Sequence, residues 1–293
     1  MKDLIGIIGS TPLVEIQKLN PNPGVRIFGK LEGQNPGGSV KDRAAYNMIK
    51  SALDRGQIKK GDRLVEATSG NTGIALAMIA RQLGVDMTLI MPAKATIERR
   101  QVMKAYGADL ILTPADQSIE DSRLLAEKMV AEEGYIMLDQ FNNPDNAAMH
   151  YKSTGPEIWR DTEGLVTHFV SAMGTTGTIM GTSRYLKEQN PDVQIVGTQP
   201  EEGSSIPGIR RWSPDFQPQI FDASRVDQTI SVSEEEAQKQ AVALAREEGI
   251  FSGMSSGGAF YAALQVAQQI EKGLIVFIVC DRGDRYLSSG IFD

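Results

Sequence analysis

The sequence has a single cysteine, no long apolar run and no cluster of basic residues, and each absence removes a class of protein. One cysteine, Cys280, allows no disulfide within the chain and suits a reducing compartment. The apolar runs at 74–80 and 274–280 are far shorter than the ~20 residues of a membrane span, and the N-terminus lacks an apolar signal segment. The net charge of −7 argues against a nucleic-acid partner. We therefore expect a cytoplasmic protein that binds neither membrane nor nucleic acid.

Short β-rich runs alternate with helical patterns along most of the chain. The expected strands are residues 64–67, 87–91, 109–113, 136–138, 168–172, 194–198, 227–232 and 274–280. The expected helices are residues 72–82, 97–106, 118–133, 178–189, 233–247 and 258–270. Alternation of this kind is typical of parallel sheets with right-handed crossovers. Over 293 residues it predicts an α/β fold of two lobes, each a mostly parallel twisted sheet flanked by helices.

Three polar segments punctuate this pattern. Asn142-Asn143-Pro144-Asp145 is a turn signal and predicts a lobe boundary near 141–144. The stretch 200–225 is long and rich in Pro, Gly and Ser, which is typical of functional or mobile loops. The Glu98-Arg99-Arg100 run is typical of a solvated helix face.

A glycine- and threonine-rich loop, Gly174-Thr175-Thr176-Gly177-Thr178, follows an expected strand and opens an expected helix. Glycines let the backbone approach a ligand, and the free N–H groups at a helix start favour anions. The loop therefore suits a phosphate, although it lacks the Gly-Lys-Ser/Thr of a Walker loop and the spacing of a dinucleotide fingerprint. The alternative is an ordinary turn with capping threonines.

Two more loops share this arrangement. Thr68-Ser69-Gly70-Asn71-Thr72-Gly73 could hold a carboxylate or a second anion, unless Asn71 or Thr72 only caps the helix. Gly253-Met254-Ser255-Ser256-Gly257-Gly258 has more glycines than a cap requires, although propensity favours Ser255 or Ser256 as the N-cap.

Lys41 lies in the first turn of a helix that begins near Ser39. A cation there meets the positive end of the helix dipole, which lowers the pKa of its amine. A lowered pKa is what an amine nucleophile needs. Taken alone, Lys41 would be one more surface lysine, so its neighbours decide its role.

In this order and spacing, the loops resemble the fold type II family of pyridoxal-phosphate (PLP) enzymes, specifically the cysteine synthases (O-acetylserine sulfhydrylases). The resemblance runs from Gly9-Ser10-Thr11-Pro12-Leu13 to the segment 280–288. The segments 201–212 and 141–146 resemble the B-type branch. The family usually has Asn where this chain has Ser10, and this chain ends soon after residue 290.

The resemblance implies PLP as cofactor, a homodimer and no metal. Lys41 would be catalytic and would link covalently to the cofactor, Asn71 would bond its 3′-oxygen, and Ser255 would face its pyridine nitrogen. The residues that would bind the cofactor phosphate are Gly174, Thr175, Thr176, Gly177 and Thr178. The residues that would hold the substrate carboxylate are Thr68, Ser69, Gly70, Thr72 and Gln140.

The implied reaction replaces the acetate of O-acetyl-L-serine with sulfide to give L-cysteine. Arg210 and Arg211 would lie at the active-site entrance, where an arginine would also admit thiosulfate; the alternative is that they are solvated or pair with Glu201 and Glu202. Cys280 and Asp281, at a strand end, are additional candidates.

The resemblance also implies lobe boundaries. Residues 1–11 and 35–143 would form the N-terminal lobe, in which a mobile subdomain at about 85–134 closes over bound substrate. Residues 12–34 and 144–293 would form the C-terminal lobe, which binds the cofactor phosphate.

Other readings remain open. O-phosphoserine sulfhydrylases, and other PLP enzymes that replace or eliminate a β-substituent, share these loops. A more remote alternative is a non-enzymatic anion-binding α/β protein. Lys41 separates these classes, because a simple binder has no use for a covalently held cofactor.

Overall fold

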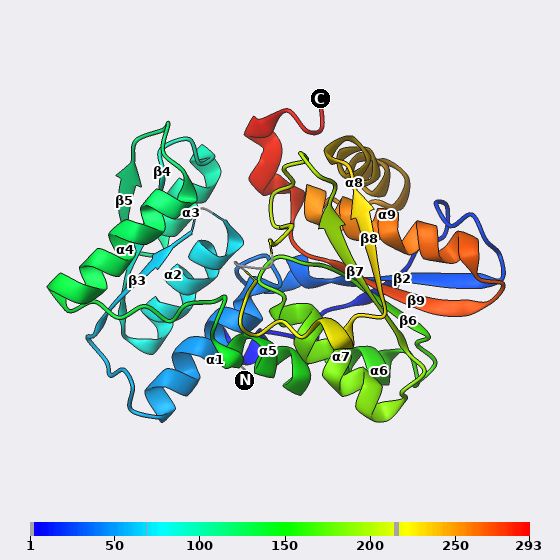
Figure 1. The fold of residues 1–293 in the computed structure, drawn as a ribbon, viewed down its shortest axis with the longest axis horizontal. Helices are drawn as coiled ribbons and strands as arrows, with labels where there is room; N and C mark the ends of the chain where they lie inside the picture. Colours follow the sequence, from blue (N-terminus) through cyan, green and yellow to red (C-terminus); the bar gives the residue numbers. More distant parts are fainter. Residues whose placement is uncertain (1–2, 69, 214–216) are drawn as a thin grey trace.

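The computed structural model describes residues 3–68, 70–213 and 217–293 as two α/β lobes built on two separate sheets (Figure 1). The larger sheet has the strand order β1-β2-β9-β6-β7-β8, and its pairs are parallel except β1 with β2. Its strands are β1 (Leu13–Glu15), β2 (Val25–Leu31), β6 (His168–Ala172), β7 (Gln194–Pro200), β8 (Gln228–Val232) and β9 (Gly273–Val279). The smaller, all-parallel sheet contains β3 (Arg63–Ala67), β4 (Asp86–Pro92) and β5 (Asp109–Thr113). The predicted fold class is confirmed.

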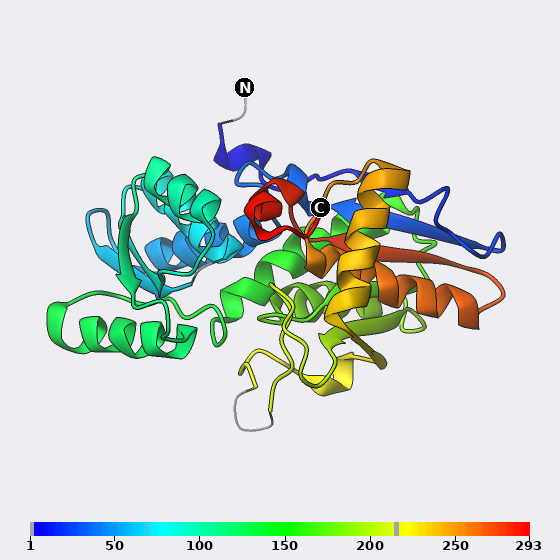
Figure 2. The same cartoon turned by 90° about the horizontal axis from the view of Figure 1, so that it is seen from above.

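Helices cover both faces of each sheet (Figures 1 and 2). They are α1 (Lys41–Asp54), α2 (Asn71–Leu83), α3 (Ile97–Ala105), α4 (Ile119–Glu133), α5 (Pro144–Lys152), α6 (Thr154–Asp161), α7 (Gly177–Gln189), α8 (Glu234–Glu248) and α9 (Met254–Gln269). Helices α8 and α9 pack on one face of the larger sheet, and α6 and α7 pack on the other. Helices α1, α2 and α3 share a core with one face of the smaller sheet, and α4 covers its other face. Among the described residues, no helix is both long enough and apolar enough to cross a bilayer.

Strand β9 shows why the chain contains an uninterrupted apolar run. Ile275 and Phe277 point into the core beneath α9, whereas Val276 and Ile278 point into the core beneath α7. Because successive side chains of a strand alternate between faces, a central parallel strand must be apolar at every position.

Several element predictions need correction. Residues 136–138 form no strand: Ile136 makes only an isolated bridge to Leu64. Helix α9 begins four residues before the expected position, because the glycines of its first turn are helical. Strands β1 and β2 and helices α5 and α6 were not predicted. Ser233 caps α8, since its Oγ accepts from the N–H of Glu236 at 3.1 Å.

The two lobes touch through the C-terminal 3₁₀ helix (Gly283–Ser289), which lies between them (Figures 1 and 2). Glu98, in the first turn of α3, accepts from the N–H and the hydroxyl of Ser288 at 3.1 and 2.8 Å. The Arg99 guanidinium lies 4.9 Å from the ring centroid of Tyr286. Glu98 and Arg99 are therefore interlobe contacts rather than a purely solvated helix face.

A buried group of four charges fixes α1 against the larger lobe. Arg43 donates through Nε to Glu32 and through Nη1 to Glu157, both at 2.7 Å. Lys30, on β2, pairs with the other oxygen of Glu157 at 2.8 Å. Ser10, which has a left-handed φ of 49°, donates its backbone N–H to Glu157 at 2.9 Å. Arg43, two residues after Lys41, thereby attaches α1 to α6 and to the end of β2.

Replacing Arg43 with alanine should destabilise the protein by about 3–5 kcal/mol, because it leaves Glu32 and Glu157 buried without their cation. The matched control is Arg26→Ala, which breaks the exposed 2.8 Å pair with Glu15 and should cost no more than about 1 kcal/mol. Urea unfolding of both variants measures the difference. Equal losses of free energy would show that the buried group does not hold α1.

Candidate active site

Four helices begin where the carboxyl ends of the strands of both sheets meet. Helix α1 begins at Lys41, α2 at Asn71, α7 at Gly177 and α9 at Met254. Each helix start carries unpaired N–H groups and the positive end of a dipole, which together attract anions.

Asp281 links three of these helix starts. Its carboxylate accepts from Asn71 Nδ2 at 2.6 Å, from the N–H of Gly253, the N-cap of α9, at 3.1 Å, and from the Tyr286 hydroxyl at 2.5 Å. Its backbone forms a bridge with Ser39, just before α1. Asp281, one of the two additional candidates, is therefore buried among the predicted site residues.

Lys41 is the first residue of α1 and is mostly buried. Burial lowers the pKa of its amine, although the charge of Asp281 acts against that shift. Burial also raises the pKa of the Cys280 thiol to about 12, so that thiol stays neutral beside the amine. A lysine with a lowered pKa can serve as a nucleophile or a base.

The loop from Gly174 to Thr178 connects β6 to α7 and has the features of an anion site. Thr176 is the N-cap of α7 in the left-handed conformation, with φ at 69°. Its Oγ1 is buried and has no hydrogen-bond partner among the described residues. Backbone strain and an unpaired buried hydroxyl are both costly without a ligand. The loop therefore fits the phosphate of a cofactor.

His150, on α5, contacts Thr178, the last residue of the same loop. Its Nε2 lies 3.3 Å from the hydroxyl of Thr178, and its Nδ1 lies 2.8 Å from that of Thr154. Burial, together with the charge of Arg43, lowers the pKa of His150 to about 3, so the ring is neutral. His150 was not predicted as part of the site, because nothing near it in sequence links it to the loop.

The second predicted loop joins β3 to α2 and meets Gln140. The Thr72 hydroxyl donates to Gln140 Oε1 at 2.7 Å, and Thr68 is buried nearby in sequence. Gly70 is the N-cap of α2, so neither Asn71 nor Thr72 is the cap. Ser69 lies outside the described residues.

Ser255 lies in the first turn of α9, and its side chain contacts the Cys280 thiol. Gly253 is the N-cap, so the interpretation of Ser255 or Ser256 as the cap is wrong. Ser256 instead accepts from the backbone N–H of Cys280 at 2.9 Å.

The loop after β7 passes over the Gly174 segment. The N–H of Arg210 donates to the carbonyl of Met173 at 2.8 Å, and Trp212 Nε1 donates to that of Gly174 at 2.9 Å. The Arg210 guanidinium stacks near Trp212 and lies 3.9 Å from Glu120 of α4, not beside Glu201 or Glu202. It therefore reaches from one lobe to the other.

Arg211 differs from its neighbour. Both side chains are exposed, but that of Arg211 makes no hydrogen bond or ion pair within the described residues. Of the two predicted arginines, only Arg210 stacks on the ring of Trp212 in the described structure.

Asp42, directly after Lys41, is a buried acid that was not assigned a role. Its Oδ2 accepts from the N–H of Gly37, and its Oδ1 has no partner among the described residues. Burial raises the pKa of Asp42 to about 7, although Gly37 and Arg285 act against the shift. The carboxyl is thus partly protonated at neutral pH.

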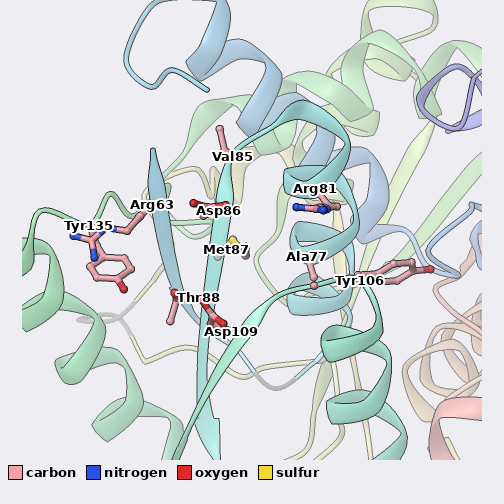
Figure 3. A pocket seen from close by; sticks show the side chains of 11 residues that line it. Arg63, Ala77, Arg81, Val85, Asp86, Met87, Thr88, Tyr106, Asp109 and Tyr135 are labelled. Atoms are coloured by element: carbon pink, nitrogen blue, oxygen red, sulfur yellow. The ribbon is translucent and has the colours of Figure 1, made fainter. Parts of the chain in front are cut away.

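A pocket at the opposite edge of the smaller sheet is separate from this region (Figure 3). It is lined by the first residues of the three strands, Arg63, Asp86 and Asp109, and by Tyr135, whose ring centroid lies 4.3 Å from the Arg63 guanidinium. Catalytic sites of α/β sheets form at the carboxyl ends of strands. The pocket is therefore not a candidate for the catalytic site.

Comparison with known proteins gives consistent matches. Residues 4–281 match the family described as "Pyridoxal-phosphate dependent enzyme". The chain is 58% identical to cysteine synthase B of Pseudomonas aeruginosa over 286 residues, covering 98% of this chain and 96% of that protein. It is 56% identical to cysteine synthase B of Escherichia coli over 292 residues, covering 100% and 96%. The crystal structure of a cysteine synthase from Entamoeba histolytica is 39% identical with a TM-score of 0.94, covering 100% of this chain and 90% of that chain.

Asp42 should make the stability of the protein fall with rising pH. Its pKa is about 7 in the folded chain and about 3.9 when unfolded. Between these values unfolding releases a proton, so the free energy of unfolding falls by up to about 1.4 kcal/mol per pH unit. Asp42→Asn should therefore gain stability relative to the wild type from pH 5 to pH 8, measured by urea unfolding. Parallel curves, or a relative loss, would contradict the raised pKa.

Proposed function

Because the chain belongs to the pyridoxal-phosphate dependent enzyme family, we propose that it is a cysteine synthase acting on O-acetyl-L-serine. Sulfide replaces the acetate at the β-carbon, and L-cysteine and acetate are the products. The proposal is supported most by the mostly buried Lys41 at a meeting point of helix starts. The same place presents the buried hydroxyl of Thr176, which has no hydrogen-bond partner among the described residues.

The proposed cofactor contacts follow from these positions. The loop from Gly174 to Thr178 would hold the phosphate, Asn71 the 3′-oxygen, and Ser255 the pyridine nitrogen. When bound, pyridoxal phosphate supplies an electron sink that makes the α-proton of an attached amino acid acidic. A serine cannot hold the ring nitrogen protonated as a carboxylate would, so the sink is moderate and prompt loss of the β-substituent is favoured.

Lys41 would carry the proton transfers. Its lowered amine pKa leaves more of the neutral form, so Nζ can take the proton from the substrate α-carbon. Thr68, Gly70, Thr72 and Gln140 would fix the substrate carboxylate and thereby aim that α-carbon at Nζ. After sulfide has added to the β-carbon, Nζ would return the proton. Two half-reactions of this kind imply ping-pong kinetics.

Arg210 would widen the choice of sulfur donor. A guanidinium binds an oxyanion through a planar fork of donors, and the stacking of Arg210 near Trp212 holds this one beside the Gly174 segment. We propose that thiosulfate is accepted as well as sulfide, giving S-sulfocysteine. The same side chain could receive a phosphate leaving group, which keeps O-phosphoserine as the alternative acceptor substrate.

We also propose the larger-scale properties that the resemblance implies. The lobe boundaries stay at residues 1–11 with 35–143 and 12–34 with 144–293. The segment 85–134 would close over bound substrate, and its contacts through Glu98 and Glu120 are ones that such a motion would remake. A homodimer and a cytoplasmic location complete the proposal, the latter supported by the single cysteine.

Lys41→Ala should give a folded protein that neither forms cysteine from O-acetylserine nor shows the absorption of a covalently bound cofactor. The matched control is Lys50→Ala, an exposed residue of the same helix that pairs with Asp54. Absorption spectra, far-UV circular dichroism and a cysteine assay measure the difference. Near wild-type turnover by Lys41→Ala would remove Lys41 from the mechanism.

Arg210→Ala should lower kcat/KM for thiosulfate by about 10- to 100-fold more than for sulfide, the loss of a charge-assisted bond of ~1.5–3 kcal/mol. Arg211→Ala is the control, because only Arg210 of these two exposed neighbours stacks on Trp212 and reaches Glu120 within the described residues. It should affect both donors alike. Equal losses for both donors in Arg210→Ala would show that this arginine does not select the donor.

A further inference from the structure

Asn146, in the first turn of α5, lies between the two halves of the proposed site. The residue is 2% exposed. One Nδ2 hydrogen is donated to the carbonyl of Gln140 at 2.9 Å, and the other to the hydroxyl of Thr175 at 3.0 Å. A single amide group therefore contacts both Gln140, in the segment proposed to hold the substrate carboxylate, and Thr175, in the loop proposed to hold the cofactor phosphate.

The bond to Thr175 determines which way that hydroxyl can act. A threonine hydroxyl has one hydrogen and two lone pairs. Because Thr175 accepts from Asn146, its own hydrogen is free to be donated to an anion in the loop. The carbonyl end of Asn146 reaches the start of α7: a Cβ on Gly177 would lie 2.0 Å from Oδ1. The amide thus fills the space that Gly177 leaves open.

The hydrogen bond to the carbonyl of Gln140 connects Asn146 to a residue that is proposed to hold the substrate carboxylate. Gln140 Oε1 already accepts from the Thr72 hydroxyl at 2.7 Å, which leaves its NH₂ group as a donor. Asn146 holds the backbone of the same residue. A carboxylate that binds the Gln140 side chain therefore binds a residue whose backbone carbonyl is linked, through Asn146, to Thr175 of the phosphate loop.

Contacts with neighbouring residues hold the first turn of α5, which contains Asn146, in place. Asn143 caps the helix, accepting from the N–H of Asp145 at 3.0 Å. Asp145 pairs with Arg55 at 2.5 Å, and its carbonyl accepts from Asn47 Nδ2 at 2.7 Å. Asn47 belongs to α1, the helix of Lys41, and Arg55 directly follows that helix. Both contacts therefore anchor α5 to α1.

We propose that Asn146 is a positioning residue that couples the substrate-carboxylate segment to the cofactor-phosphate loop, so that a bound carboxylate slows cofactor loss. The inference rests on the proposed function. Linkage applies to the equilibrium affinities: if a bound carboxylate tightens cofactor binding by some factor, the held cofactor strengthens carboxylate binding by that same factor.

The test follows loss of pyridoxal phosphate from the holoenzyme by visible absorption, with and without propionate. Propionate presents a carboxylate but has no amino group to react with the cofactor, and sodium chloride at equal ionic strength is the reference. In the wild type, propionate should slow cofactor loss by about fivefold or more. In Asn146→Ala and Asn146→Asp the effect should fall to within about twofold. Asn47→Ala, which removes only one of the contacts that hold the first turn of α5 and touches neither loop, should keep it.

Two further readouts separate coupling from a loss of folding. Thr175→Val keeps Asn146 but removes its acceptor, and it should also lose the propionate effect. The ³¹P NMR signal of the bound cofactor should shift with propionate in the wild type and not in Asn146→Ala. Absence of a visible cofactor band in the wild type would overturn the proposed function. A band with no propionate effect in the wild type, or an undiminished effect in Asn146→Ala, would overturn the coupling alone.

Discussion

The guanidinium of Arg43 is held in the interior between Glu32 and Glu157, and the position of Lys41 depends on this contact. All three side chains are nearly or fully buried, and Lys30 balances the second carboxylate. Four charges in a dry interior are tolerated only when each meets its partner in good geometry. Meeting that condition fixes the first turn of α1 against β2 and α6. The amine two residues earlier is therefore held by the larger lobe, although its helix packs on the smaller one.

Around that fixed point, the electrostatics of the site follow from topology. Parallel strands deliver four helix starts to one place, and each contributes donors and a positive dipole end. An anionic cofactor and a substrate carboxylate suit such a place, whereas a charged lysine does not. Thr176 is the strained residue of this arrangement: its left-handed backbone and its hydroxyl, which has no partner in the described part of the chain, are stable only in a structure that constrains both. Asp281 then joins the starts of α2 and α9 through its hydrogen bonds, and its backbone forms a bridge with Ser39 just before α1.

Much of this arrangement could be predicted from local patterns. Apolar runs such as that of β9 and the glycine-rich loops at 68–73 and 174–178 are local signals, and they indicated the fold class and most of the candidate residues. Helix α5 is short and polar and follows a turn signal, so it was not predicted, and with it Asn146 and His150 were missed. The partners of Arg43 and Asp281 are distant in sequence and have no local signature. Arg210 pairs with Glu120 of the other lobe rather than with the nearby Glu201, because tertiary packing decides between acceptors that the sequence leaves equivalent.

The proposed reaction is tested most directly by the stoichiometry of acetate release without a sulfur donor. Purified enzyme at known cofactor content is mixed with O-acetyl-L-serine, and acetate is measured during the first turnover. A mechanism in two half-reactions predicts about one acetate per cofactor-loaded chain, followed by resumed release when sulfide is added. No acetate before sulfide arrives would contradict it, because acetate loss would then require the nucleophile, and Lys41 and the surrounding helix starts would not complete the first half-reaction alone.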